Sequence, residues 1–366
     1  MVTAFRSVLV SIVLLLALAL ISKAQVPQWN QVTDSLLADV DLSERLPSDL
    51  NALQFVDETT GFISTHNGEV IRTEDGGITW KLFYADFAGS GGYFNEGGYY
   101  FLTKNLWFSV PAHSSAKWAR TLDAGKHWEF FNNTTCPDVT PFFLNADDGW
   151  GISVSSICST VNGGKNWTVL AQHPGGVNAL NRIFVLDTTH GWVTGEGQVF
   201  ATTDGAHWTK RSQDSSIAAL ELHFLTPTQG YARVKVYDSE RAGHQQQRMI
   251  YSSDGGRHWQ PSTWSGGSAS EPQVFSNCVS LGEKEVWVIG YSSKANSNGP
   301  NTDSGQYDFV LFRSRDGGAS FASIGKLPDN AGQPRSIAIA SQKGRRVLLV
   351  LDTNAALWQA FLSDTL

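Results

Sequence analysis

The sequence predicts an all-β fold, a seven-bladed β-propeller of four-stranded antiparallel blades whose last blade is closed by the N-terminal strand. Three observations support this prediction. An eight-residue motif recurs along the chain, each copy lies among short apolar runs separated by turn residues, and strand-like sequence remains at both ends. A repeat of about 40 residues that holds four short strands is typical of a propeller blade.

The motif first occurs as TEDGGITW, from Thr73 to Trp80. It recurs as TLDAGKHW, TVNGGKNW, SSDGGRHW and SRDGGASF, and once in a shorter form, TTDGAHW. We call these six segments the boxes; their aromatic ends are 48, 39, 41, 51 and 62 residues apart. The box residues expected to have structural roles are Thr73, Asp75, Gly77, Trp80, Thr121, Asp123, Gly125, Trp128, Thr160, Asn162, Gly164, Trp167, Asp204, Trp208, Ser252, Asp254, Gly256, Trp259, Ser314, Asp316, Gly318 and Phe321.

Each box is expected to form a tight turn between the third and fourth strands of its blade. The Ser or Thr hydroxyl and the Asp carboxylate can accept hydrogen bonds from turn N–H groups. Gly77 and its equivalents allow a positive φ, and Trp80 and its equivalents return a large ring to the sheet. A catalytic residue is needed once rather than six times, and Asn162 replaces Asp in the third box. We therefore interpret the boxes as structural and predict no catalytic residue among them.

The strands follow the same order in every unit. In the third unit, an apolar strand precedes a turn at Asp147 to Gly149, a second strand begins at Trp150, a third ends at Thr160, and a fourth follows Trp167. Strands of this length and composition, separated by Gly, Asp and Asn, are typical of antiparallel sheets. The predicted blades are residues 50–84, 98–132, 139–171, 179–212, 218–263, 272–324, and 334–362 together with 27–33.

The seventh blade has no box. The runs RSIAIA, RRVLLVLD and AALWQAFL, between Arg335 and Leu362, predict three strands. The missing fourth strand is predicted at the other end of the chain, where PQWNQV carries Trp29. Closure of this kind leaves no unpaired edge at the junction of the ring.

The first 24 residues resemble a secretory signal peptide. Arg6 precedes an apolar run from Val8 to Ile21, and small residues end at Ala24. A membrane anchor is the alternative, although fourteen apolar residues are short for a span of about 20. We therefore predict a signal peptide at 1–24 and one propeller domain at 25–366, exported to a periplasm or the extracellular space. No later run is long enough to cross a membrane.

Composition limits the function classes. The net charge is −7, and it becomes −9 without Arg6 and Lys23. An acidic surface does not suit a nucleic-acid partner.

The chain has three cysteines. Cys136 and Cys158 either form a disulfide, which leaves Cys278 as a free thiol, or remain two buried thiols. The sequence has no cysteine and histidine spacing typical of metal sites, so we expect no metal or other cofactor, and we expect a monomer.

The recurring GW…TxDGGxxW pattern, the seven units and the N-terminal tryptophan strand resemble the photosystem II stability/assembly factor-like branch of the bacterial neuraminidase repeat, or Asp-box, propellers. The resemblance covers essentially the whole mature chain. It implies a non-enzymatic exported scaffold that binds a protein, such as a membrane-protein assembly intermediate. In a photosynthetic organism the resemblance implies the thylakoid lumen, but a lone Arg6 replaces the twin-arginine or two-part targeting sequence of photosynthetic members.

The alternative function is an Asp-box glycoside hydrolase, similar to sialidases or glucanases. Such enzymes need two placed carboxyl groups, or a nucleophilic Tyr with several arginines. If the chain is a binding protein, inserted loops supply the aromatic and cationic groups that anchor interfaces. The candidate binding residues are Tyr93, Phe94, Arg241, His244, Arg248 and Tyr307. The alternative for each of them is packing on its own blade.

Overall fold

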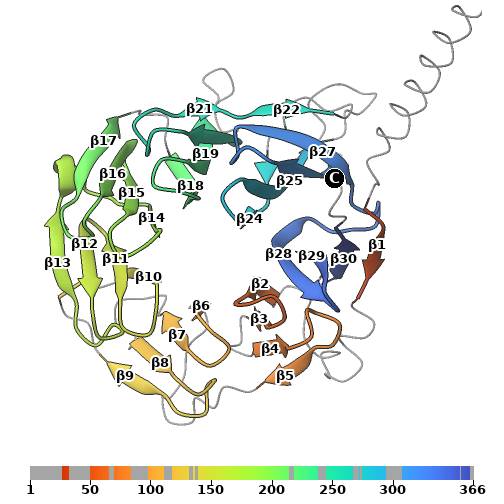
Figure 1. The fold of residues 1–366 in the computed structure, drawn as a ribbon, viewed down its shortest axis with the longest axis horizontal. Coiled ribbons are helices and arrows are strands. Elements are labelled where there is room, and N and C mark those ends of the chain that lie inside the picture. The colour runs from red at the N-terminus through yellow and green to blue at the C-terminus, as the bar shows by residue number, and fades with distance from the viewer. Residues whose placement is uncertain are drawn as a thin grey trace, which may run out of the picture.

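The computed structural model describes residues 27–32, 50–65, 70–83, 98–110, 118–131, 135–136, 139–213, 218–237, 245–266, 272, 274–293, 307–354 and 356–362. These residues form seven sheets arranged in a ring around a central axis (Figure 1). The predicted all-β, seven-bladed propeller is confirmed. The expected signal peptide at 1–24 lies outside the described residues.

In blades one to five the strands follow the chain from the centre of the ring outward (Figure 1). Blade one contains β2 (Leu50–Phe55), β3 (Gly61–Thr65), β4 (Val70–Thr73) and β5 (Lys81–Phe83). Blade two contains β6 (Gly98–Phe101), β7 (Trp107–Val110), β8 (Trp118–Thr121) and β9 (Glu129–Phe131). Blade three contains β10 (Thr140–Phe143), β11 (Gly149–Ser153), β12 (Ser156–Thr160) and β13 (Thr168–Gln172).

Blade four contains β14 (Arg182–Val185), β15 (Gly191–Gly195), β16 (Gln198–Thr202) and β17 (Thr209–Gln213). Blade five contains β18 (Ala218–Phe224), β19 (Gly230–Tyr237), β20 (Gln245–Ser252) and β21 (Gln260–Pro261). Blade six contains β23 (Val274–Phe275), β24 (Val279–Leu281), β25 (Glu285–Ser293), β26 (Tyr307–Ser314) and β27 (Ser320–Lys326). A short 3₁₀ turn, η2 (Pro174–Gly176), leads from blade three to blade four.

The ring is closed by the predicted N-terminal strand. Blade seven contains β28 (Pro334–Gln342), β29 (Arg345–Asp352) and β30 (Leu357–Phe361), and β1 (Trp29–Gln31) pairs antiparallel with β30. Trp29 lies opposite Ala360, and Gln31 lies opposite Trp358. The Trp29 ring packs against a core cluster that includes Trp287 and Trp358. The expected closure of blade seven is therefore confirmed.

Stacked aromatic rings join neighbouring blades. Phe62 of β3 stacks on Phe101 of β6 with ring centroids 4.3 Å apart, and Phe108 of β7 stacks on Phe143 of β10 at 3.8 Å. Trp192 of β15 stacks on the Phe224 ring of β18 at 3.6 Å. Aromatic pairs of this kind contribute about 0.5–1.5 kcal/mol beyond the area they bury. The core of the molecule thus lies between the sheets, and it fixes each blade against the next.

The boundary predicted between blades five and six is wrong by one short strand. Residues after β21 form β22 (Thr263–Ser265), which pairs parallel with β27 instead of completing blade five. Trp264 explains the transfer, because its ring stacks on Phe321 at 4.7 Å and meets Phe312 edge-on at 4.9 Å. The box of blade six ends in Phe rather than Trp, and the indole contributed by β22 packs directly on that Phe.

Blade seven also has a turn clip, although the sequence shows no box there. Asp352 ends β29 and is fully buried. One of its oxygens, Oδ1, accepts hydrogen bonds from the N–H groups of Asn354 and Ala356, at 2.8 and 2.9 Å. The other, Oδ2, accepts from the N–H of Gly332 at 2.7 Å and from Nε1 of Trp358 at 2.8 Å. Asp352 therefore holds the turn between β29 and β30 as the Asp of a box holds its turn, although the spacing to the tryptophan differs and no glycine pair is present.

No helix in the described ranges is long and apolar enough to span a membrane.

Candidate functional site

The box turns use their own polar groups. In the first box, the Thr73 hydroxyl donates to Oδ1 of Asp75 at 2.8 Å and accepts from the Gly77 N–H at 3.0 Å. Oδ1 of Asp75 also accepts from the N–H groups of Ile78 and Thr79, both at 2.9 Å. Gly77 has φ 91°, and Trp80 donates from Nε1 to the Gly77 carbonyl at 3.1 Å. The carboxylate is therefore fully engaged in holding the turn.

The histidines that precede three of the box tryptophans belong to the same turns. His127 lies 2.5 Å from Asp123, His207 lies 2.7 Å from Asp204, and His258 lies 2.5 Å from Asp254, each measured from Nδ1 to Oδ2. The hydrogen bonds from His127 lower the pKa of Asp123 to about 2. Each histidine contacts its own box, so the three do not form a shared site.

The boxes also join neighbouring blades. The Gly205 carbonyl accepts a hydrogen bond from Nε1 of Trp150 at 2.9 Å, and the Gly255 carbonyl accepts one from Nε1 of Trp192 at 3.0 Å. In both cases the donor begins the second strand of the preceding blade. A box turn is therefore a connection between two blades as well as a clip within one blade.

Aromatic side chains connect the innermost strands of three successive blades. The Phe142 ring of β10 meets Phe184 of β14 edge-on at 5.4 Å, and Phe184 meets the His223 ring of β18 at the same distance. All three rings are only partly buried. On blade two, the Tyr100 hydroxyl donates to the Phe143 carbonyl at 3.1 Å. The innermost strands of blades two to five thus carry partly buried aromatic groups that contact the next blade.

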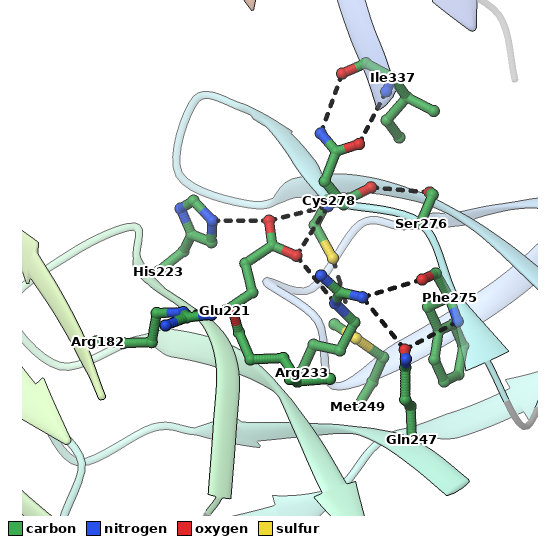
Figure 2. A network of polar contacts seen from close by, with 12 residues as sticks. Arg182, Glu221, His223, Arg233, Gln247, Met249, Phe275, Ser276, Cys278 and Ile337 are labelled. Atoms are coloured by element: carbon green, nitrogen blue, oxygen red, sulfur yellow. Dashed lines mark hydrogen bonds and ion pairs between the residues drawn. The ribbon is translucent and has the colours of Figure 1, made fainter. Parts of the chain in front are cut away.

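A polar network adjoins these rings on blades five and six (Figure 2). Glu221 of β18 accepts a hydrogen bond on Oε2 from Nε of Arg233 at 3.2 Å, and its Oε1 lies 3.0 Å from Nε2 of His223. The N–H of Cys278 donates to Oε1 at 3.0 Å. Nη1 of Arg233 donates to the Phe275 carbonyl at 3.0 Å. Figure 2 shows these groups converging between β18 and the segment that leads into β24.

The same segment reaches blade seven. The Asn277 amide donates to the Ile337 carbonyl at 3.2 Å and accepts from the Ile337 N–H at 2.8 Å. Residues 275–278 therefore connect the innermost strands of blades five and seven. A partly buried, hydrogen-bonded network of this kind first serves to hold the blades in place.

Arg182 lies at the border of the network, where β14 begins (Figure 2). Its Nε donates to the Leu220 carbonyl at 2.6 Å and its Nη1 to the Asn181 carbonyl at 2.7 Å. Burial and the nearby charge of Arg233 lower the pKa of Arg182, and Glu221 opposes this effect. Arg182 remains exposed to solvent, whereas Arg233 is mostly covered. Arg182 therefore adds a second guanidinium group beside the Arg233–Glu221 ion pair, within range of both charges.

The carboxylate of this cluster is held in its ionised form. Burial raises the pKa of Glu221, but hydrogen bonding and the charge of His223, the charge of Arg233 and the N–H of Cys278 outweigh burial and lower it overall. A general acid for glycoside hydrolysis needs a raised pKa. The geometry around Glu221 therefore suits a structural role, in which the carboxylate holds Arg233, His223 and the Cys278 N–H, better than proton donation.

Only two of the six predicted binding residues, Arg248 and Tyr307, lie in the part of the chain that the structure describes. Tyr93, Phe94, Arg241 and His244 lie outside the described residues, as do most of the inserted loops that carry them. Arg248 lies on β20 of blade five, opposite Val234. Tyr307 begins β26 of blade six, where its ring meets that of Tyr291 edge-on at 5.7 Å. The structure does not bring Arg248 and Tyr307 into one cluster, so their role in binding stays a prediction.

The cysteines take one of the two expected arrangements. Cys136 and Cys158 form a disulfide that ties the segment before blade three to β12. Cys278 is a buried thiol, with its Sγ 3.9 Å from Sδ of Met249. Among the described residues, no three His, Cys, Asp or Glu side chains gather as a metal site would require.

Arg182, Glu221, His223 and Arg233 were not predicted as a group. Their positions in the sequence are up to 51 residues apart. The register of β18 and β19 places Glu221 opposite Arg233, and the packing of blade four on blade five brings Arg182 to β18. The signal in the sequence was a charged or polar residue within largely apolar strands, the first strands β14 and β18 and the second strand β19.

The fold and the inner cluster define the chain as a seven-bladed β-propeller with an aromatic and cationic inner surface. Its structure resembles that of YCF48 bound to a D1 peptide, with a TM-score of 0.56 and 17% identity over 92% of this chain and 97% of that one. YCF48 from Cyanidioschyzon merolae gives a TM-score of 0.54 and 15% identity over 91% and 98%. Virginiamycin B lyase from Staphylococcus aureus gives 0.53 and 9% over 92% and 99%.

These similarities establish a shared fold, and the fold is common to a peptide-binding protein and an enzyme. No family model and no curated protein sequence matches the chain.

Proposed function

We propose that this protein is a non-enzymatic scaffold that binds a segment of another polypeptide at its inner surface, around Arg182, Phe184 and His223. The observation that carries the proposal is the position of Arg182, which is exposed at the start of β14, the strand whose Phe184 ring meets partly buried rings of the blades on either side. Arginine and aromatic side chains are the residues that most often anchor protein interfaces.

Charge indicates which segments suit the surface. The chain as a whole carries a net charge of −7, yet the Arg182 cluster combines two arginines with one glutamate. A peptide with a carboxylate, from an acidic side chain or a free C-terminus, would pair with Arg182, and an apolar neighbour would pack on Phe184. Arg–carboxylate pairs are among the stronger hydrogen-bonded contacts in proteins.

The similarity to YCF48 bound to a D1 peptide supports a polypeptide as the ligand. We extend the proposal to export, on the basis of the apolar run after Arg6 and the Cys136–Cys158 disulfide, which is favoured in oxidising compartments. The partner is then an exported protein or the exposed segment of a membrane protein. In a photosynthetic host, a photosystem II assembly intermediate fits this description.

Glycoside hydrolysis is the weaker alternative. The box carboxylates hold turns, and Glu221 is kept ionised by its partners. No observation on the described residues favours hydrolysis over binding.

The experiment is a peptide selection on immobilised mature protein, residues 25–366, with a random peptide library and with the D1 peptide as a defined probe. We expect enriched peptides to bind roughly tenfold more weakly to Arg182→Ala, a difference of about 1.4 kcal/mol. Arg315→Ala is the matched control, because Arg315 is exposed on the blade-six box turn away from the inner strands. Equal binding to all three proteins would contradict the proposed site. Turnover of sialyl or glucan substrates that a single Asp or Glu substitution abolishes would replace the scaffold with an enzyme.

A further inference from the structure

The outer edges of the blades are protected in different ways. An unpaired edge strand exposes N–H and C=O groups that can pair with another chain, and proteins block such edges by shortening, charging, covering or interrupting them with proline. In this propeller β1, β5 and β9 have three residues each, β21 has two and contains Pro261, and β27 is covered by β22. Only β13 and β17 are both longer and uncovered among the described outer strands.

β13 and β17 can be compared position by position. Each pairs with the third strand of its blade through the same register, with the same bulge. Cys158 lies opposite Val169 in blade three, and Phe200 lies opposite Lys210 in blade four. The two strands read Thr-Val-Leu-Ala-Gln and Thr-Lys-Arg-Ser-Gln. Where β17 has two adjacent positive charges, β13 has Val169 and Leu170 and no charge.

The contrast extends to the turns of the two blades. Three large apolar side chains of blade three are exposed to solvent: Val154 by 66%, Val161 by 77% and Val169 by 39%. The equivalent positions of blade four are Glu196, Thr203 and Lys210, all polar. Blade three also has Asn162 where the other boxes have Asp. The periphery of blade three is thus apolar and weakly charged at positions that a neighbouring blade makes polar.

Blade six shows how such an edge is used. β22 lies along β27 as an additional outer strand, with Thr263 opposite Ser320 and Ser265 opposite Ala322. The outer edge of a blade in this protein can therefore pair with an additional extended segment.

We propose that β13 is a second binding surface, which accepts an extended, β-branched and uncharged segment of a partner protein as a fifth strand of blade three. Main-chain hydrogen bonds to β13 would provide the pairing, and Val169 and Val161 would provide apolar contacts. A second copy of this chain is a poorer occupant, because two molecules with a net charge of −7 repel each other.

The test uses a reciprocal exchange of charges in the mature protein. In one variant, Val169→Lys and Leu170→Arg give β13 the charges of β17; in the other, Lys210→Val and Arg211→Leu give β17 the apolar pair of β13. The probe is a fluorescent peptide of alternating Val and Thr with a Lys at each end. The control probe has alternate main-chain amides methylated, so that it cannot form a ladder.

We expect the unmodified protein to bind one probe molecule, and the bound probe to protect the β13 amides from hydrogen exchange. The β13 variant should bind the probe roughly tenfold more weakly. The β17 variant should gain a second binding event, a result that misfolding cannot imitate. The proposal would be overturned by no binding, by equal binding of the methylated probe, or by equal binding to the β13 variant. A concentration-dependent dimer that the β13 variant abolishes would also overturn it, in favour of a second copy.

Discussion

Trp358 donates a hydrogen bond from its indole Nε1 to Oδ2 of Asp352 across 2.8 Å, and neither residue belongs to a recognisable box. The pair links the end of β29 to β30, the strand on which the N-terminal strand closes the ring. Blade seven is therefore held by a buried carboxylate that also binds three main-chain N–H groups.

Replacing Asp352 by Ala should destabilise the protein strongly. Four donors, of which the Ala356 N–H and the Trp358 indole are buried, would lose their acceptor, which we expect to lower the free energy of unfolding by about 3 kcal/mol or more. Asp352→Asn keeps one acceptor oxygen and should cost less. Urea denaturation measures both values, and the exposed Asp329→Ala is the control expected to change little. Equal stability of Asp352→Ala and the control would show that the clip is dispensable.

The carboxylates of the boxes should make stability dependent on pH at the acid end. Burial raises the pKa of Asp254, but hydrogen bonds from His258, Ser252 and Arg257 outweigh burial and lower it to about 2, from an ordinary value of 3.8. A lowered pKa gives stabilisation that is complete above about pH 4 and is lost as the pH falls towards 2. Asp254→Asn should therefore be less stable than the unmodified protein at pH 5, and the two should converge near pH 2. A constant difference across this range would contradict the interpretation.

The disulfide should stabilise blade three. Cys136 and Cys158 close a loop of 22 residues, for which loss of the bond costs about 3 kcal/mol. The urea midpoint of the protein should fall when reductant is added, and that of Cys136→Ser/Cys158→Ser should not respond to it. Thiol titration of the denatured, unreduced protein should find only Cys278. Three reactive thiols before reduction would exclude the bond.

The additional strand of blade six should depend on Trp264. Its partly buried ring contacts Phe275, Phe312 and Phe321; removal of a fully buried ring costs about 3–5 kcal/mol, and we expect the loss here to be at or below the lower end of that range. Trp264→Ala should therefore release β22 and increase hydrogen exchange at Ser320 to Ala322. Trp264→Phe keeps a ring and should retain most of the protection. Unchanged exchange in the Ala variant would show that β22 does not need its anchor.

The sequence predicted the features that rest on the repeated boxes and on the alternation of apolar and polar residues in strands. The boxes at Thr73 and its equivalents located every turn between third and fourth strands in six blades, and Trp29 located the closing strand. These features depend on local turn chemistry and on strand patterning, which a single sequence carries directly.

The features that were missed depend on distant or unrepeated residues. Asp352 precedes Trp358 by six positions, whereas Asp75 precedes Trp80 by five, so the clip of blade seven does not match the box pattern. β22 has only three residues, and its position is set by the packing of the Trp264 ring on Phe321. The pairing of Glu221 with Arg233 follows from register, and the approach of Arg182 follows from the stacking of two blades.

Closure of the ring is the basis of every site described above, because the inner strands keep their positions only while the blades form a closed circle. The most direct test compares urea denaturation of two chains, residues 25–366 and residues 33–366, with and without a synthetic peptide of residues 25–32. Since the shorter chain loses Trp29 and the ladder to β30, its free energy of unfolding should fall by at least about 3 kcal/mol, and the peptide should restore it. Identical denaturation of the two chains, with no effect of the peptide, would contradict closure by the N-terminal strand.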